Sequence, residues 1–245
     1  MRSADPRLVQ ARRIVESVKR VYAVASSKGG VGKTTVACIL SLLLAREDYR
    51  VGLLDLDFTN ATTHLVLGVD AEKASIEEGF GVKPLEVEGV LLATPVVFTR
   101  GNPLALRGSS AVDAMRELLV AVDWGRLDAL ILDMPPGAKD ELLEVLAIGA
   151  KILVVTTQDP LSLSSVRRLL RLLKSEGARS VGVIENMSAR RDPLLLSEVS
   201  LLGFKHLGTL PYDSSLRDSI GSPSRLLDTE LARALAGTLR EILIL

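Results

Sequence analysis

The stretch that decides the fold is residues 28–35, which read Lys-Gly-Gly-Val-Gly-Lys-Thr-Thr. It follows the short apolar run 21–25 and opens residues 33–46, which have helical spacing. Glycines here allow backbone N–H groups to turn inward, and the start of a helix adds unpaired donors and a partial positive charge. A loop of this composition between a strand and a helix predicts a phosphate-binding site.

Each residue of this loop has an expected contact with the bound phosphates. Four residues would surround the phosphates with backbone N–H groups: Gly29, Gly30, Val31 and Gly32. Lys33 would contact the β- and γ-phosphates, Thr34 would bind Mg²⁺, and Thr35 would contact the α-phosphate. The strict pattern would begin with glycine at position 27, which is Ser27 here, whereas the variant that begins with Lys28 is intact.

The rest of the chain alternates between short apolar runs and longer helical stretches. The apolar runs are residues 21–25, 51–56, 90–93, 129–132, 152–157, 181–184 and 207–210. The helical stretches are residues 33–46, 111–122, 140–148, 161–175, 193–202 and 225–243. Apolar strands separated by helices are typical of a parallel sheet buried on both faces. We therefore expect an α/β fold of three layers, with a mostly parallel central sheet between helices.

The two ends of the chain carry patterns of their own. Residues 1–20 predict an amphipathic helix ahead of a single domain that covers residues 21–245. The basic side chains of that helix form either a solvated face or a docking surface for an acidic partner. The apolar stretch 231–245 lacks the basic polar face of a membrane-targeting helix, so we expect a packed terminal helix. Residues 58–89 and 98–110 have no regular pattern and are of a length typical of functional loops.

Three aspartates lie where predicted strands end. Asp55 and Asp57 close the second strand, and Asp133 follows the apolar residues 129–132. Carboxylates at this end of a parallel strand point into the ligand crevice. Because Asp55 and Asp57 are two residues apart, they fall on the same side of the strand, and two close carboxylates repel unless a cation lies near them.

The composition excludes several classes of function. Lys plus Arg and Asp plus Glu each total 30, so no basic excess favours nucleic acid, and aromatic residues are only 3% of the chain. The single cysteine, Cys38, excludes an intramolecular disulfide and a multi-cysteine metal site within one chain. The longest apolar run is about half of the ~20 residues that span a bilayer, and no signal peptide is evident. We expect a cytoplasmic protein without nucleic-acid or membrane partners.

The loop variant that begins with Lys28 resembles that of the MinD, ParA and Mrp group of P-loop ATPases. The resemblance covers residues 21–215 and implies a P-loop NTPase fold, slow Mg-ATP hydrolysis and an ATP-dependent homodimer. In that group the first lysine reaches the partner's phosphates across the dimer, so Lys28 would act in trans like an arginine finger. The resemblance makes Lys28, Lys33 and Asp57 the catalytic residues. Asp57 would orient the attacking water and contact Mg²⁺, and Asp55 would lie near Mg²⁺.

The same resemblance assigns residues further along the chain. Residues 130–137 resemble a Walker B strand, in which Asp133 binds Mg²⁺ through water and the Gly137 amide meets the γ-phosphate. Asn186 offers an amide donor and an acceptor, which suit an adenine edge. In the resembled family this asparagine and a later Pro-x-Asp segment surround the adenine, and Pro211 and Asp213 stand at that position. No guanine-reading motif is present, so we expect ATP and ADP rather than GTP.

The motifs that distinguish the subfamilies of this group are less specific than the phosphate-binding loop. Residues 133–137 (Asp-Met-Pro-Pro-Gly) and 185–188 (Glu-Asn-Met-Ser) resemble the Mrp-type iron–sulfur carriers, which usually have Cys-x-x-Cys just after the second string. Here residues 189–193 read Ala-Arg-Arg-Asp-Pro, so we expect no iron–sulfur cluster held by this chain. Residues 54–58, His64, residues 67–68 and residues 103–108 resemble the archaeal ATPase-type HypB proteins, which lack these cysteines and assist nickel insertion into hydrogenase.

The first interpretation is therefore a HypB-like nickel insertion factor for hydrogenase maturation, with a HypA-like metallochaperone as its partner. The alternative is an Mrp-type iron–sulfur assembly ATPase without its usual cysteines, with iron–sulfur apo-proteins as partners. A second alternative is a positioning ATPase of the MinD or ParA kind, which the neutral charge disfavours. A small-molecule kinase would need a second substrate motif, and none is evident.

Overall fold

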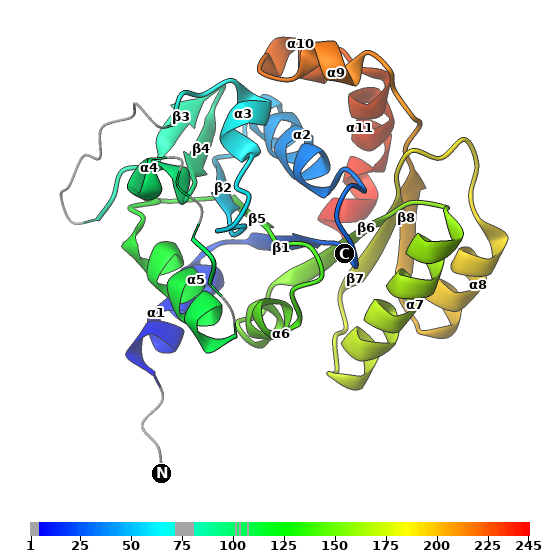
Figure 1. The fold of residues 1–245 in the computed structure, drawn as a ribbon, viewed down its shortest axis with the longest axis horizontal. Helices are drawn as coiled ribbons and strands as arrows, with labels where there is room; N and C mark the ends of the chain where they lie inside the picture. Colours follow the sequence, from blue (N-terminus) through cyan, green and yellow to red (C-terminus); the bar gives the residue numbers. More distant parts are fainter. Residues whose placement is uncertain (1–4, 72–80, 101, 103, 107) are drawn as a thin grey trace.

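A computed structural model describes residues 5–71, 81–100, 102, 104–106 and 108–245. The described strands form one sheet in the order β3-β4-β2-β5-β1-β6-β7-β8 (Figure 1). They are β1 (Arg20–Ala25), β2 (Val51–Asp55), β3 (Leu85–Val87), β4 (Val90–Ala93), β5 (Ala129–Asp133), β6 (Lys151–Thr156), β7 (Val181–Glu185) and β8 (Lys205–Thr209). Neighbouring strands of this set run parallel except β3 and β4, which are antiparallel. The predicted mostly parallel sheet is confirmed.

Helices cover both faces of this sheet (Figure 1). One face carries α2 (Lys33–Arg46), α3 (Thr63–Leu67), α9 (Leu216–Ser219), α10 (Pro223–Leu227) and α11 (Glu230–Leu243). The other carries α1 (Pro6–Ser17), α5 (Ser109–Ala121), α6 (Lys139–Ala147), α7 (Pro160–Ser175) and α8 (Pro193–Leu201). The short helix α4 (Val96–Thr99) follows β4. The three predicted layers are therefore present.

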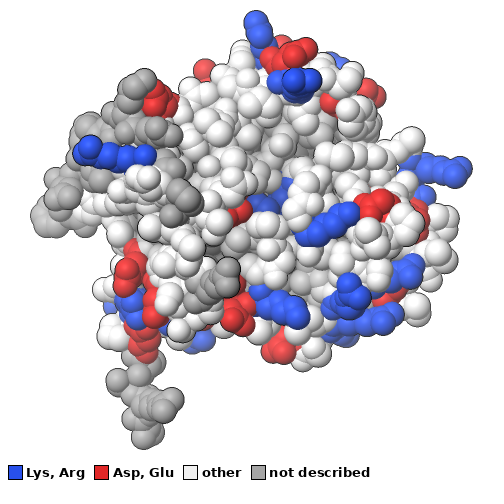
Figure 2. Space-filling model, in the orientation of Figure 1, with Lys and Arg blue, Asp and Glu red and all other residues white. Residues whose placement is uncertain are grey.

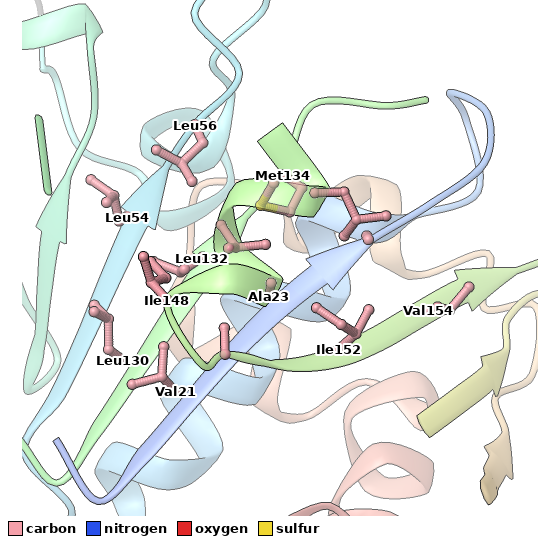
Figure 3. Close-up of a cluster of buried hydrophobic side chains, with 14 of the residues drawn as sticks. Val21, Ala23, Leu54, Leu56, Leu130, Leu132, Met134, Ile148, Ile152 and Val154 are labelled. Atoms are coloured by element: carbon pink, nitrogen blue, oxygen red, sulfur yellow. The ribbon is translucent and has the colours of Figure 1, made fainter. Parts of the chain in front are cut away.

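The central strands send alternate side chains into two separate cores. In β1, Val21 and Ala23 belong to the core under α6 and α7, whereas Tyr22 and Val24 belong to the core under α2 and α11. Figure 3 shows Val21 and Ala23 in one layer with side chains of β2, β5 and β6, beside Ile148 at the end of α6. Because both faces are buried, such strands read as continuous apolar runs rather than alternating ones.

Three helices begin with the same pair of residues. Asp5, Asp159 and Asp192 stand just before α1, α7 and α8, and each is followed by proline at the first helical position. Each carboxylate accepts a hydrogen bond from a backbone N–H of the first turn. An acidic cap satisfies a donor that the helix leaves unpaired, and proline there loses no hydrogen bond. The Asp-Pro pairs therefore set where these helices start.

The structure differs from the sequence predictions in several helices and strands. The prediction of one helix over residues 225–243 is wrong, because α10 ends at Leu227 and α11 begins at Glu230. Thr229 starts the new helix by accepting a hydrogen bond from Ala232 N at 3.1 Å. The strand β3 lies inside residues 58–89, where no strand was expected; residues 72–80 of that stretch lie outside the described residues.

Both ends of the described chain pack onto the domain. Residues 1–4 of the predicted N-terminal helix lie outside the described residues, and α1 packs on α5 through Arg7, which pairs with Asp113 and Glu117. α11 buries Leu235 and Ile242, which confirms the expected packed terminal helix. No helix in the described part of the chain has both the length and the apolarity needed to cross a membrane.

Candidate nucleotide-binding site

The candidate site lies at the edge of the sheet where β1, β2, β5, β6 and β7 end. Parallel strands that share a direction bring their carboxyl ends to one edge, so the loops that follow them meet there. The loop between β1 and α2 contains Gly30 and Gly32, with φ of +78° and +83°. These values favour glycine, and a Cβ on Gly32 would also collide with the Asn186 amide. Among the described residues, no side chain caps the N-terminus of α2, so its backbone donors suit a ligand.

Two residues at the start of α2 converge on one carboxylate. The Lys33 ammonium lies 2.5 Å from Asp133 Oδ1, and the Thr34 hydroxyl donates to Asp133 Oδ2 at 2.8 Å. Lys33 is only 7% exposed and Asp133 only 1%, so both charges are buried. Burial raises the pKa of Asp133, and the neighbouring Lys33 opposes that rise. Thr35 is half-buried in the same turn. The loop and the Walker B-like strand thus meet as predicted.

Asp55 lies beside Asp133 because β2 and β5 are neighbours in register. Both of its carboxylate oxygens accept hydrogen bonds, from Asp57 N at 3.0 Å, Thr62 N at 3.2 Å, and the Thr63 hydroxyl at 2.8 Å. Burial, and then the charge of Asp133, raise the pKa of Asp55 to about 7. Asp55 therefore orders the loop that follows β2.

Asp57 is not on the strand with Asp55. β2 ends at Asp55, and Asp57 lies in the next loop, half-buried, where it accepts a hydrogen bond from Asn60 N at 2.9 Å. The expectation that both carboxylates lie on one side of a strand is therefore wrong, because the strand stops between them. Asp57 still acts electrostatically on the Asp133 carboxylate, which places it near the same site.

Lys28 forms an ion pair that the sequence did not reveal. Its ammonium lies 3.0 Å from both carboxylate oxygens of Asp159, the residue that caps α7. Hydrogen bonds from Ser162 and Thr157, with a further one from Lys28, hold the pKa of Asp159 well below its usual range. The signal that could have found Asp159 is its place just after β6, at the same sheet edge as the loop.

Gly137 follows the strand β5 and already has a hydrogen-bond partner. Its N–H donates to the carbonyl of Ser26 at 3.0 Å, and its φ is +67°. This bond ties the segment after β5 to the segment after β1. A contact between the Gly137 amide and a γ-phosphate requires this hydrogen bond to break. Binding of such a ligand would therefore separate the segment after β5 from the segment after β1 at Gly137.

Asn186 is the candidate base-binding residue that the structure places best. It is 1% exposed and donates from Nδ2 to the Val31 carbonyl at 2.8 Å, which ties it to the phosphate-binding loop. Its Oδ1 is buried without a hydrogen-bond partner among the described residues. A buried acceptor without a donor fits the amino group of adenine.

The second base-binding segment is engaged within the chain. Pro211 lies next to the loop of Asn186, since Ser188 N donates to the Leu210 carbonyl at 2.9 Å. Asp213, however, accepts hydrogen bonds from Ser215 and from Glu230 N, the latter at 2.7 Å, so it supports the start of α11. The structure therefore places Pro211 near the loop of Asn186, whereas the Asp213 carboxylate is bound to the backbone at the start of α11.

Sequence reasoning missed a buried network behind Asn186. Glu185 accepts hydrogen bonds from His206 Nε2 at 2.5 Å, Gln158 Nε2 at 2.7 Å and Asp192 N at 2.9 Å. Burial raises the pKa of Glu185, but these hydrogen bonds outweigh burial and lower the pKa overall. Gln158 also donates to the carbonyl of Arg190. The network therefore positions the loop 186–192 against the loop that carries Asp159.

Two residues singled out earlier are buried. Cys38 lies in the core, and burial raises the pKa of its thiol, which disfavours the thiolate form needed for metal binding. His64 is 6% exposed and lies in α3, so it is not a surface histidine. Pro103 and Arg107 of the HypB-like string lie outside the described residues. Within the described residues, no group of three or more His, Cys, Asp and Glu is arranged to hold a metal ion.

The glycine-rich loop, the Lys33–Asp133–Thr34 cluster and the parallel sheet define the class: a nucleotide-binding protein of the P-loop type. A family model described as ParA, "NUBPL iron-transfer P-loop NTPase", matches residues 17–219. The chain belongs to this ParA family of P-loop NTPases, and it is an ATP hydrolase.

Similar proteins agree with this assignment. A cytosolic Fe-S cluster assembly factor Nubp2 homolog from Drosophila erecta is 31% identical over 236 residues, covering 88% of this chain and 91% of the relative. The Drosophila melanogaster homolog is 32% identical over the same length. A nucleotide-binding protein from Archaeoglobus fulgidus in complex with ADP has a TM-score of 0.72 at 23% identity, covering 89% of this chain and 92% of its own. The cell division ATPase MinD from Pyrococcus furiosus has a TM-score of 0.65 at 22% identity, with 92% and 98% covered.

These comparisons confirm the predicted resemblance and the P-loop NTPase fold. They favour iron–sulfur assembly, the alternative interpretation, over nickel insertion, because the relatives are named as iron–sulfur cluster assembly factors. Nothing in them supports a role in hydrogenase maturation. The names of these relatives also place them in the cytosol.

Proposed function

We propose that this chain is a Mg-ATP-driven switch in iron–sulfur cluster assembly that works as an ATP-dependent homodimer in the cytosol. The observation that carries the nucleotide site is the convergence of Lys33 and Thr34 on Asp133, next to helix donors that no described side chain caps. The relatives support the biological role, because they are named as cytosolic Fe-S cluster assembly factors.

The residues present fit Mg-ATP. Lys33 would exchange Asp133 for the β- and γ-phosphate oxygens, which releases Thr34 and Asp133 to hold Mg²⁺, directly and through water. Asp55 would lie near the metal and keep the loop of Asp57 in place. Mg²⁺, when bound, neutralises charge that develops on the phosphates.

The other nucleotide contacts follow the same layout. The backbone of residues 29–32 and the Thr35 side chain would bind the phosphates, and Asn186 Oδ1 would accept from the adenine amino group beside Pro211. Asp213 would contribute by holding the turn that carries Pro211, since its carboxylate already binds the start of α11. Gly137 would leave Ser26 for the γ-phosphate.

Hydrolysis would depend on Asp57 and on a second copy of the chain. Asp57 would orient the attacking water, and Lys28 would leave Asp159 to reach the phosphates of the partner subunit. In the single chain Asp159 neutralises Lys28, so hydrolysis would be slow until dimerisation moves that lysine. Basal turnover of about 10⁻⁴–10⁻² s⁻¹ is typical of P-loop switches without their activator.

The cluster would be held by cysteines of a partner protein. The chain contains one cysteine, and residues 189–193 occupy the place where the resembled carriers have Cys-x-x-Cys. A [4Fe–4S] cluster requires about four thiolates, more than two copies of this chain supply. The proposed partners are therefore iron–sulfur scaffold or apo-target proteins.

The test is a pull-down from native lysate with the Asp57→Ala protein loaded with Mg-ATP or with ADP. Lys33→Ala, which loses the phosphate contact, is the matched control. We expect iron–sulfur scaffold or apo-target proteins to be recovered in one nucleotide state and not with Lys33→Ala. Recovery of a nickel chaperone in their place, or equal recovery in all three samples, would contradict the proposal.

A further inference from the structure

A groove of about 350 Å³ lies between α6 and α7, next to the nucleotide loops. Its floor is apolar and consists of Met134, Leu142, Leu169 and Leu172. Leu172 is partly exposed, whereas the other three are buried by the neighbouring core. The groove opens on the α6 and α7 face of the sheet, and of the proposed nucleotide contacts only Gly137 is among the described residues that line it.

The rim of the groove is basic. Lys139 at the start of α6 and Arg168 in α7 are both exposed, and neither side chain forms an ion pair with another described residue. No acidic residue lines the groove in the part of the chain that the structure describes. Figure 2 shows basic groups over α6 and α7 on either side of a largely uncharged surface. An apolar floor between two unpaired cations is complementary to an apolar segment that carries carboxylates.

The wall of the groove is built from the loops that contact nucleotide. Ser26 and Ser27 line it from the loop after β1, and Pro135 and Gly137 line it from the segment after β5. Gly137 N donates to the Ser26 carbonyl at 3.0 Å, and the hydroxyls of Ser27 and Ser165 lie 2.8 Å apart. A change in the bond between Gly137 and Ser26 therefore changes the shape of the groove directly.

We propose that this groove docks an acidic segment with apolar anchors from a partner protein, and that nucleotide state sets its affinity. Only the second part rests on the proposed function, since it requires Gly137 to respond to nucleotide. A partner is favoured over a second copy of this chain, because a symmetric contact through this groove would set Lys139 and Arg168 against the same cations of the other copy.

The test starts with a display library of random 12-residue peptides, selected on the full-length Asp57→Ala protein in Mg-ATP. Affinities of enriched peptides are then measured by fluorescence anisotropy. We expect enrichment in Asp and Glu around Leu or Phe, and binding at least ten-fold weaker for Arg168→Glu and for Leu172→Glu. The matched control is Arg240→Glu, a charge reversal on α11 at the opposite face of the sheet, which should leave affinity unchanged.

Further measurements distinguish loss of peptide docking from loss of folding, and they test the effect of nucleotide on docking separately. With Asp57 retained, thermal melts and basal ATP hydrolysis of Arg168→Glu and Leu172→Glu should match those of the unsubstituted protein, which shows that these variants fold. Methyl NMR of Leu142, Leu169 and Leu172 should show shifts on adding peptide, whereas Leu235 of α11 should not shift. Peptide affinity is then compared between Mg-ATP and ADP, and we expect a difference of about five-fold or more.

Each outcome decides one part of the proposal. Failure to enrich acidic peptides, or binding that is indifferent to Arg168→Glu and Leu172→Glu, overturns the docking site. Binding that needs these residues but is equal in Mg-ATP and ADP supports the site and overturns its coupling to nucleotide. Loss of the ATP site itself would appear separately, as failure of the parent protein to bind nucleotide.

Discussion

Lys33 is a buried cation whose partner is set by its immediate surroundings. It is 7% exposed, and its one ion pair among the described residues is with Asp133. A buried charge that loses its partner is costly, so Lys33 needs an anion at all times, either Asp133 or a phosphate. This exchange of partners is the residue-scale event from which the proposed switch begins.

Two substitutions separate nucleotide binding from hydrolysis. Lys33→Ala should abolish ATP binding, because it removes the cation proposed to contact the phosphates. Asp57→Ala should retain ATP binding but slow hydrolysis by about 10²-fold or more, since it removes the group proposed to orient water. Equilibrium binding of a fluorescent ATP analogue and single-turnover hydrolysis measure the two effects. Normal turnover by Asp57→Ala would refute the assignment of Asp57.

The stability of the protein should depend on the ionisation of Asp55. Its pKa is raised to about 7 in the folded protein, against about 3.9 in an unfolded chain, so the folded state binds more protons between these values. Stability in Mg²⁺-free buffer should therefore fall as pH rises from about 4 to 7. Denaturant unfolding at several pH values measures this slope.

Asp55→Asn provides the control for this pH dependence. The substitution removes the titrating group, so the slope between about pH 4 and pH 7 should flatten whatever its effect on absolute stability. A slope identical to that of the parent protein would show that another group is responsible.

At the scale of the elements, α7 and α8 begin in the same way but with different consequences. Asp159 and Asp192 both cap their helices ahead of a proline, yet Asp159 also pairs with Lys28. One side chain thus starts a helix and holds the proposed trans-acting lysine. Comparing substitutions of Asp159 and Asp192 therefore distinguishes the loss of a helix cap from the loss of the ion pair with Lys28.

Asp159→Ala and Asp192→Ala should each lower the free energy of unfolding by about 1 kcal/mol, the usual value of an acidic cap. Asp159→Ala alone should also change the ATPase rate, because it releases Lys28. Urea unfolding and steady-state hydrolysis of both variants measure these effects. Equal ATPase rates for the two variants would mean that the ion pair has no part in hydrolysis.

At the scale of the whole molecule, the sheet order brings distant segments to one edge. Asp133 and Lys33 are far apart along the chain, but β5 pairs with β1, the strand that leads into the loop before α2. Lys28 lies 36% exposed on this edge. The residues proposed to bind nucleotide and the lysine proposed to act in trans therefore lie at the same edge of the sheet.

The oligomeric state should follow nucleotide. Asp57→Ala in Mg-ATP should sediment as a dimer, because slow hydrolysis holds the ATP state, and it should be monomeric in ADP. Combining Asp57→Ala with Lys28→Ala should weaken the dimer, since the lysine proposed to cross the interface is lost. Analytical ultracentrifugation measures both states. A dimer that persists in ADP would contradict the dependence on nucleotide. A Mg-ATP dimer of unchanged strength with Lys28→Ala would contradict the trans contact.

The α/β class, the glycine-rich loop before α2 and the acidic strand ends can be predicted from local patterns of residues. These features are local: the loop needs glycines and a following helix within a few residues, and a strand buried on both faces is apolar throughout. The Asp-Pro pairs likewise mark helix starts with neighbouring residues alone.

Which charged groups meet depends on how the chain folds in three dimensions. The pairing of Lys28 with Asp159, the capture of Asp213 by the start of α11 and the network of Glu185 with His206 all join residues distant in sequence. The groove between α6 and α7 likewise needs both helices and two loops to exist. Such contacts depend on the order of strands in the sheet and on the residue at which each strand ends. Local sequence patterns do not determine that order, because the pairing between strands depends on packing of the whole core.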